Sequence, residues 1–272
     1  MKSRLLVSLL VVVAAGTPGT SAVLAQQAPT ATIAPTPNLV VSGIPAIPAS
    51  VAADVRRYTE SRSATFAAWH PLRREILIST RFGNTPQLHV VTAPLGARRQ
   101  ITFFDEPVSV AAWQPRDARY FIFQRDVGGN EFAQLYRHDV ADGRVTLLTD
   151  GGRSMNGGVR FSHGGDRIAF TSTRRNGSDG DVYVMDPTDS SESRLVLEVS
   201  GGAGWAVQAW SPDDARLLVS QYLSVNQSNL YAVDVASGRS EPLTEQGEDS
   251  VFYGNATFTR DGRGIFLTTD RG

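Results

Sequence analysis

The chain has 272 residues and a formal net charge of −1, with 26 Lys and Arg residues against 27 Asp and Glu residues. A balance so close to neutral provides no global field that would attract nucleic acid or an anionic membrane, so we expect neither as a partner. The sequence contains no cysteine, which excludes disulfides, a lipid on an N-terminal Cys and thiolate metal sites.

The first 25 residues have the layout of a secretory signal peptide. A basic start at residues 1–4 precedes an apolar run over residues 5–15, and small residues lead to Ala25. The apolar run is too short to span a bilayer. We predict cleavage after Ala25, with a single-span anchor as the alternative if cleavage fails. The mature protein is then expected to be exported, periplasmic or secreted, with no membrane association.

Residues 26–60 form a linker and N-terminal segment rich in Ala, Pro, Thr and Gln. Such a composition buries too little apolar surface to order itself, so residues 26 to about 50 are expected to be an extended tether. Residues 51–59 fit either a short helix or an edge strand.

From residue 61 onward one sequence motif occurs five times. It consists of an aromatic residue, a polar turn of six residues and three consecutive apolar residues. Small residues precede each aromatic, as expected for an innermost strand. A polar hairpin, a third strand and an outer strand complete four of the five units. The aromatics are Trp69, Trp113, Phe161, Trp210 and Phe258. A repeat of about 40 to 50 residues built from short strands is typical of propeller blades.

The predicted fold class is therefore all-β, a β-propeller of four-stranded antiparallel blades. Residues 61–272 supply four complete blades and the first half of a fifth. The expected blades cover residues 61–104, 105–152, 153–201, 202–248 and 249–272. Because a propeller closes on itself, we expect a fragment of a larger ring of seven or eight blades. The alternative is a five-bladed ring whose missing outer strands come from residues 39–62, which Pro45 and Pro48 disfavour.

The repeat aromatics, the histidines and one oxygen-rich stretch all have structural interpretations that involve no ligand. The recurrence of the five aromatics at one repeat position indicates packing between blades. His70 and His163 fall in turns and are expected to be solvated, and the four histidines lack the spacing of a zinc site. The oxygen-rich stretch at residues 176–181 is interpreted as a hairpin turn in preference to a calcium loop. We predict no metal and no cofactor.

The repeats beginning at Trp210 and Phe258 resemble those of TolB-like proteins and of the N-terminal propellers of prolyl oligopeptidase-family serine peptidases. Residues 125–136, 170–183 and 210–226 favour the second resemblance. It implies a propeller that covers a C-terminal α/β-hydrolase domain of the same polypeptide and admits only short peptides. That domain is absent from these 272 residues, which contain no Gly-x-Ser-x-Gly motif, and we predict no catalytic residue. The alternative is a TolB-like propeller that binds a protein partner without catalysis.

Four residues are candidates for contact with a peptide substrate. The resemblance implies that propeller loops reach the central cavity, where the carboxylate of Glu131 would pair with a peptide amino terminus. Arg153 and Arg160 flank the third innermost strand, and Trp205 precedes the fourth, where it departs from the repeat pattern. A solvated loop acid is the default interpretation of Glu131, and an ordinary surface position is that of the two arginines.

Overall fold

The computed structural model describes residues 31–108, 110–202, 204–244 and 250–271. The predicted signal peptide, residues 1–25, lies outside the described residues. The chain divides into two compact units, Met1–Ser61 and Arg62–Gly272, and each is described by itself.

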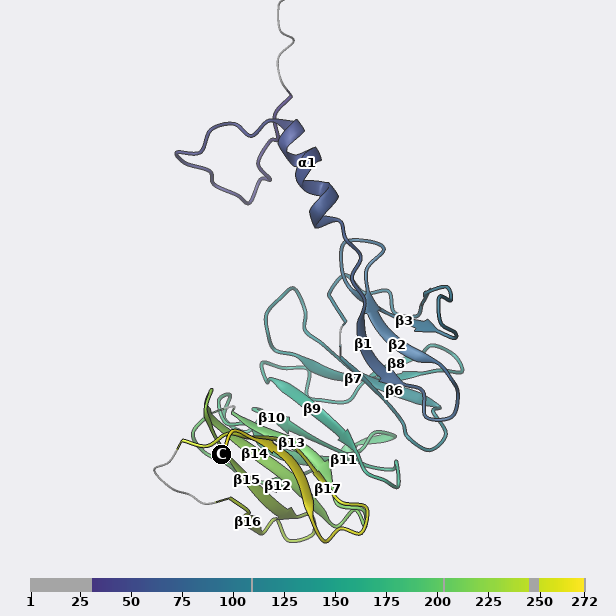
Figure 1. The fold of residues 1–272 in the computed structure, drawn as a ribbon, viewed down its shortest axis with the longest axis vertical. Coiled ribbons are helices and arrows are strands. Elements are labelled where there is room, and N and C mark those ends of the chain that lie inside the picture. Colours follow the sequence, from purple (N-terminus) through teal and green to yellow (C-terminus); the bar gives the residue numbers. More distant parts are fainter. Residues whose placement is uncertain (1–30, 109, 203, 245–249, 272) are drawn as a thin grey trace, which may run out of the picture. The chain divides into compact units, whose positions relative to one another are not determined.

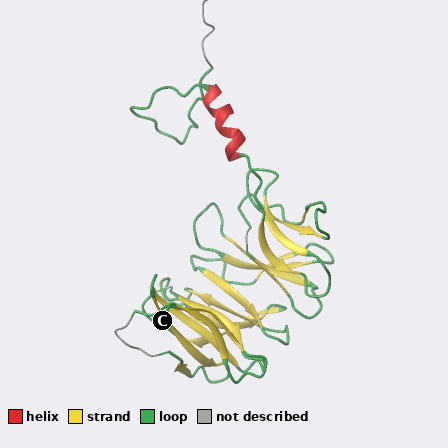
Figure 2. Ribbon diagram, viewed as in Figure 1, coloured by secondary structure: helices red, strands yellow, loops and turns green. Residues whose placement is uncertain are grey.

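The first unit contains one helix, α1 (Ala49–Thr59), drawn in red in Figure 2. Pro48 precedes the helix in an extended conformation, and Arg56 and Arg57 occupy the last turn, where cations interact well with the helix dipole. Residues 51–59 are thus helical. Residues 39–41 are irregular, so the outer strands that a five-bladed ring would take from residues 39–62 are not formed.

The second unit is a β-propeller of four four-stranded antiparallel sheets and one two-stranded sheet, which run consecutively along the chain (Figure 1). Blade 1 contains β1 (Thr65–Trp69), β2 (Ile76–Thr80), β3 (Gln87–Val91) and β4 (Arg99–Gln100). Blade 2 contains β5 (Ala111–Trp113), β6 (Tyr120–Arg125), β7 (Gln134–Asp139) and β8 (Val145–Leu147). Blade 3 contains β9 (Asn156–Phe161), β10 (Ile168–Ser172), β11 (Asp181–Asp186) and β12 (Asp189–Leu197). Blade 4 contains β13 (Trp205–Trp210), β14 (Arg216–Ser224), β15 (Gln227–Asp234) and β16 (Ser240–Pro242). Blade 5 contains β17 (Tyr253–Phe258) and β18 (Ile265–Thr269).

The blades pack face to face, with the first strand of each blade beside the first strand of the next. The strands β1, β5, β9, β13 and β17 contact one another in that order, and each lies at one edge of its sheet. The four-stranded blades pair their strands in sequence order. This is the radial arrangement of a propeller, with the first strands innermost.

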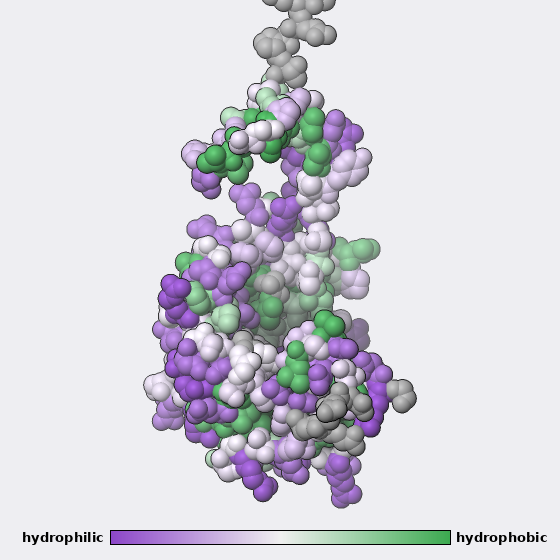
Figure 3. All heavy atoms as spheres, turned by 90° about the vertical axis from the view of Figure 1, so that its left-hand side faces the viewer, coloured by the Kyte–Doolittle hydropathy of each residue, from purple (hydrophilic) through white to green (hydrophobic). Residues whose placement is uncertain are grey.

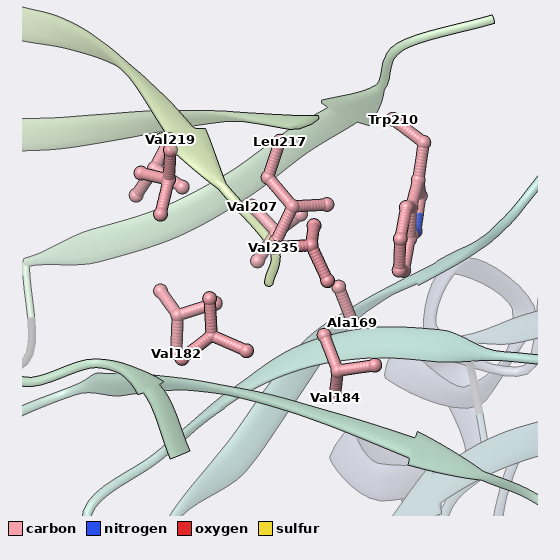
Figure 4. Packing of buried hydrophobic residues seen from close by; sticks show 10 residues of the cluster. Ala169, Val182, Val184, Val207, Trp210, Leu217, Val219 and Val235 are labelled. Atoms are coloured by element: carbon pink, nitrogen blue, oxygen red, sulfur yellow. The ribbon is translucent and has the colours of Figure 1, made fainter. Parts of the chain in front are cut away.

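The packing between blades 3 and 4 shows how the repeat builds the core. Trp210, Leu217 and Val219 of blade 4 are buried against Ala169 and Val184 of blade 3 (Figure 4). Fully burying one such apolar side chain stabilises the fold by about 1.5–3 kcal/mol. The aromatic and the first and third residues of the apolar triplet thus face the preceding blade, whereas the middle residue faces the following one.

The residue after each repeat aromatic caps the turn between the first two strands. The Nδ1 atom of His70 accepts hydrogen bonds from the backbone N–H groups of Leu72 and Arg73, at 3.1 and 3.2 Å. Side-chain oxygens do the same in the other turns, namely those of Gln114, Ser162, Ser211 and Thr259. His70 is buried against Trp113, with ring centroids 4.8 Å apart. The prediction that His70 is solvated is therefore wrong, because the turn needs an internal acceptor.

Blade 2 has a turn one residue longer than the sequence repeat suggests. Trp113 pairs with Phe121, whereas Trp210 pairs with Leu217 and Trp69 with Ile76. Ala118, with a left-handed φ of 53°, lies three residues before Phe121, just as Asp214 lies three residues before Leu217, so the extra residue falls between Trp113 and Ala118. A shift of one residue reverses the faces of a strand, so the structural equivalent of the other triplets is 121–123 instead of 120–122.

The outer strand of blade 3 begins directly after a two-residue turn. Asp189 pairs with Asp186 across the strands β11 and β12, so the turn lies at Pro187 and Thr188. Residues 189–191, although polar, are thus part of a strand.

The expectation that all five aromatics are core residues holds only in part. Trp210 is 3% exposed, but its repeat equivalent Trp69 is 69% exposed, and Phe266 of blade 5 is 68% exposed. Trp69 lines an apolar cavity of about 540 Å³ together with Ile76 and Val91. Trp69 and Phe266 lie on faces of blades 1 and 5 against which no other blade of the described residues packs. Other hydrophobic residues lie among hydrophilic ones on the surface seen in Figure 3.

Candidate functional site

A buried amide organises the connection between blades 2 and 3. Gln134, 4% exposed, donates from Nε2 to the carbonyl oxygens of Phe132, Gly152 and Ser154, at 3.2, 3.3 and 2.9 Å. Its Oε1 accepts from the Thr149 hydroxyl at 2.6 Å and from the Gly151 N–H at 3.1 Å. One side chain thereby fixes the β6–β7 loop and the β8–β9 connector to each other.

Two of the four predicted contact residues lie on these two segments. Arg153, on the connector, places its guanidinium carbon 4.8 Å from the ring centroid of Phe132, on the loop. Glu131 directly precedes Phe132 and adopts a left-handed φ of 64°, with its N–H donating to Asp126 at 3.0 Å. Backbone strain of this kind in a non-glycine residue is often retained at functional sites. The structure thus brings Arg153 beside the loop that carries Glu131.

Both charged side chains are available to a ligand. Glu131 and Arg153 are exposed, and within the described residues neither forms an ion pair with another side chain. A carboxylate, a guanidinium and an aromatic ring on adjoining segments can bind an ammonium group, a carboxylate and an apolar side chain respectively. These are the groups that a short peptide presents.

Arg160 lies elsewhere, on the innermost strand β9 near its end. Its Nε donates to the carbonyl oxygen of Gln208 on β13 at 3.0 Å, and its Nη1 donates to the carbonyl oxygen of Val159 at 3.0 Å. The Arg160 carbonyl in turn accepts from Trp210 Nε1 at 2.9 Å. Arg160 therefore bridges the innermost strands of blades 3 and 4, apart from the Glu131 loop.

Trp205 lies at the interface of blades 3 and 4. Its ring is 5.3 Å from that of Tyr231, and both rings pack with Leu197 against the core of these blades. The same three residues line a cavity of about 390 Å³ with the Glu198–Ser200 connector and Ser240. The cavity includes residues of both outer strands, β12 and β16. Trp205 thus contacts third-strand and outer-strand residues in addition to its own innermost strand.

The oxygen-rich loop at residues 176–181 uses its carboxylates internally. Asp181 is fully buried and pairs with Arg175 Nε at 2.7 Å, while its Oδ1 accepts from the Val199 N–H at 2.9 Å. Asp179 accepts from the Gly202 N–H at 2.8 Å. The hydrogen bond from Asn176 and that from Gly202 lower the pKa of Asp179. The loop is a hairpin, as predicted, whose acids hold the connector to blade 4.

The first residue of the third strand in blades 1 to 3 was not singled out from the sequence. Gln87, Gln134 and Asp181 share this position, and each is buried and bonded to the connector that leaves its own blade. The signal is present in the sequence as a polar residue directly before the apolar part of each of these strands, but polar residues at strand ends are usually solvated. Only the fold shows that these side chains lie inside.

The described residues include neither a cluster of metal-binding side chains nor a membrane-spanning helix. No group of three or more His, Asp or Glu side chains is placed to hold a metal ion. The described residues contain one helix, α1, which is too short to cross a bilayer.

Solved structures of several proteins share this architecture. TolB from Acinetobacter baumannii superposes with a TM-score of 0.50 and 21% identity, covering 79% of this chain and 50% of that one. A prolyl endopeptidase, from a study of inter-domain dynamics in catalysis and specificity, gives a TM-score of 0.55 and 16% identity, covering 77% and 32%. A chain of the nidogen–laminin complex gives 0.52 and 11%, covering 75% and 71%.

At these identities the likenesses establish the fold alone. The chain spans half the length of the TolB structure and about a third of the prolyl endopeptidase chain. No protein-family model and no curated protein matches the sequence. The second unit is a β-propeller.

Proposed function

We propose that this chain is the non-catalytic propeller portion of an exported serine peptidase of the prolyl oligopeptidase type. In that role it gates the access of peptides to a C-terminal α/β-hydrolase domain of the same polypeptide. The observation that carries the proposal is the Glu131–Phe132–Arg153 arrangement. Its two charges of opposite sign, neither of which pairs with a charged side chain of the described residues, flank an aromatic ring on segments fixed by the buried Gln134. We call these three residues the peptide-contact patch.

The chemistry of the peptide-contact patch suits a short peptide with a free amino terminus. A charge-assisted hydrogen bond between a carboxylate and an ammonium group is about twice as strong as a neutral one. Phe132 and the Arg153 guanidinium add a surface for an apolar side chain. Because Gln134 fixes both segments, little ordering entropy is lost when a peptide binds.

Binding of labelled peptides tests this proposal. Fluorescence anisotropy would compare a C-terminally labelled hexapeptide with the same peptide acetylated at its amino terminus. We expect tighter binding of the free form, and Glu131→Gln should abolish the difference, since the amide carries no charge. Asp126→Asn, on the same loop, should preserve the difference. Equal binding of both peptides to the unmodified protein contradicts the proposal.

Reading the gene beyond the codon for Gly272 separates the leading proposal from its alternative. A Gly-x-Ser-x-Gly motif followed by Asp and His supports the peptidase, and a stop codon after one or two further blades supports a TolB-like propeller that binds a protein partner. The likeness to TolB supports the alternative, and it covers 79% of this chain, against 77% for the likeness to the prolyl endopeptidase.

A further inference from the structure

One position of the repeat departs from its equivalents in a single blade. The residue immediately before the repeat aromatic is small in four blades, as Ala68, Ala112, Ala209 and Thr257. Ala68 and Ala209 pack toward the following blade, where adjacent innermost strands leave little room. Blade 3 has Arg160 at this position. A place where one unit breaks a rule that the others keep is a candidate for function.

The Arg160 side chain spans the innermost strands of two blades. Its acceptors are the carbonyl oxygens of Val159 on β9 and of Gln208 on β13, each at 3.0 Å. The register of β13 shifts between Val207 and Ala209, so Gln208 sits at a bulge, which the innermost strands of blades 1, 3 and 5 also have. Two of the five guanidinium N–H groups are used in this way, and three are left to donate elsewhere.

The charge of Arg160 has no partner among the described residues. Arg125 pairs with Glu106 at 2.6 Å, Arg137 with Asp139 at 3.0 Å and Arg175 with Asp181 at 2.7 Å. No carboxylate of the described part of the chain lies within ion-pair distance of Arg160. Desolvation by the surrounding protein lowers the pKa of the Arg160 guanidinium, and no neighbouring charge contributes. Arg160 is exposed, so a bound anion can reach its guanidinium.

We infer that Arg160 is a recognition residue for a carboxylate of a peptide lying along the innermost strands of blades 3 and 4. The inference rests on the proposed function, because it names the chemical class of ligand that the propeller admits. A carboxylate suits the site better than a phosphate does. It matches the planar fork of a single guanidinium, whereas the two adjacent carbonyl oxygens would repel a doubly charged anion.

Calorimetry with two matched peptides tests the inference. The peptides are Ala-Ala-Glu-Ala-amide and Ala-Ala-Gln-Ala-amide, each with a free amino terminus, so that they differ only in one side-chain charge. The unmodified chain should bind the Glu peptide about ten- to a hundredfold more tightly, as expected for a charge-assisted pair. Arg160→Gln should remove this preference, and Arg160→Lys should retain part of it because the charge remains without the fork.

Arg239→Gln is the matched control, because Arg239 is an exposed arginine of blade 4 outside both proposed contacts. It should leave the affinities of both peptides, and therefore their ratio, unchanged. Circular dichroism would verify that each variant is folded. If Arg160→Gln does not fold, the Nε–Hε resonance of Arg160 in the unmodified protein reports the same contact, and it should shift with the Glu peptide alone.

The outcomes distinguish this inference from the proposed function. Equal binding of the two peptides by the unmodified chain, or a preference that survives in Arg160→Gln, overturns the carboxylate role and leaves the peptide-contact patch intact. A shift of the Arg160 resonance by inorganic phosphate but not by the Glu peptide overturns it in the same way. If neither peptide binds the unmodified chain, the result contradicts both the role of Arg160 and the proposed function.

Discussion

The Asp214 carboxylate of blade 4 accepts a hydrogen bond from the backbone N–H of His163 in blade 3, at 2.7 Å. Its other oxygen accepts from the Gly164 N–H at 2.8 Å. Asp214 also has a left-handed φ of 56°, like Gly165 and Gly262 at the same place in their turns. The residue must therefore tolerate this conformation and also supply an acceptor, which Asp and Asn do at the lowest cost.

Substitutions of Asp214 separate these two demands. Asp214→Gly keeps the backbone conformation but leaves two N–H groups without their acceptor, and we expect it to lower the free energy of unfolding by about 1–2 kcal/mol. Asp214→Asn keeps one acceptor oxygen and should lose less. Urea unfolding would measure both, with the exposed substitution Glu131→Gln as a reference close to zero. A glycine variant as stable as the asparagine variant would argue against the inter-blade bond.

The turn cap formed by His70 makes stability depend on pH. Burial and the Arg73 guanidinium lower the pKa of His70 below its ordinary value of 6.5, although Glu75 acts in the opposite direction. The unfolded chain therefore binds the proton more readily. The stabilisation is fully present above about pH 6.5 and is lost as the pH falls through the folded-state pKa. Burial lowers the pKa of His138 too, with the same sign.

We expect His70→Asn to flatten this dependence, because an asparagine side chain can cap the turn without titrating. Thermal melts from pH 7.5 to pH 5 would measure the change in Tm. At pH 7.5 the variant should melt near the unmodified protein, and at pH 5 its relative stability should improve. Parallel curves over the whole range would show that His70 does not titrate in this window.

Loss of the Gln134 amide should be costly, because its partners are internal. Gln134→Leu keeps the approximate volume but removes the acceptor of the Thr149 hydroxyl and the donor to three carbonyl groups. An unsatisfied buried polar group costs about 1–3 kcal/mol, so we expect a loss of at least this size in urea unfolding. Peptide binding should weaken as well, since the two segments of the patch lose their common support. Unchanged stability would contradict the assigned contacts.

Trp69 and Trp210 occupy the same repeat position in different environments. Trp210→Ala should cost about 3–5 kcal/mol, as is usual for a buried tryptophan, and also removes the hydrogen bond to the Arg160 carbonyl. Trp69→Ala should cost under about 1 kcal/mol, because surface substitutions have small effects. Equal losses in chemical denaturation would mean that another protein surface covers the face of blade 1.

The recurring features of the chain were predictable from the sequence because the same pattern of aromatic, turn and apolar residues occurs in every blade. The triplet at residues 217–219 and the aromatic Trp210 are buried for the reason that their spacing indicates. Blade 2 shows the limit of this reasoning. Its apolar run extends over residues 120–123, all buried, so the sequence pattern could not reveal which register the turn at Ala118 selects.

Burial of polar residues was the main source of error. His70 and Gln134 are the kinds of side chain that usually face water, and only the position of the surrounding strands shows that they satisfy backbone groups inside. Trp69 gave the opposite error, because its exposure depends on what covers blade 1 and not on its own repeat. Of the four predicted contact residues, Arg153 lies beside the Glu131 loop, while Arg160 and Trp205 lie elsewhere.

In each of blades 1 to 3, a side chain of the blade forms hydrogen bonds to the connector that leads to the next blade. In all five blades, a side chain of the blade caps the turn between its first two strands. The residues that hold a connector in place therefore belong to the blade that precedes it. Duplication of the gene segment for one blade would copy these contacts together with the blade. A disc assembled from such self-contained parts can acquire or lose a wedge with little change to its neighbours. Arg160, which occurs at this repeat position in one blade only, is not part of this shared set of contacts.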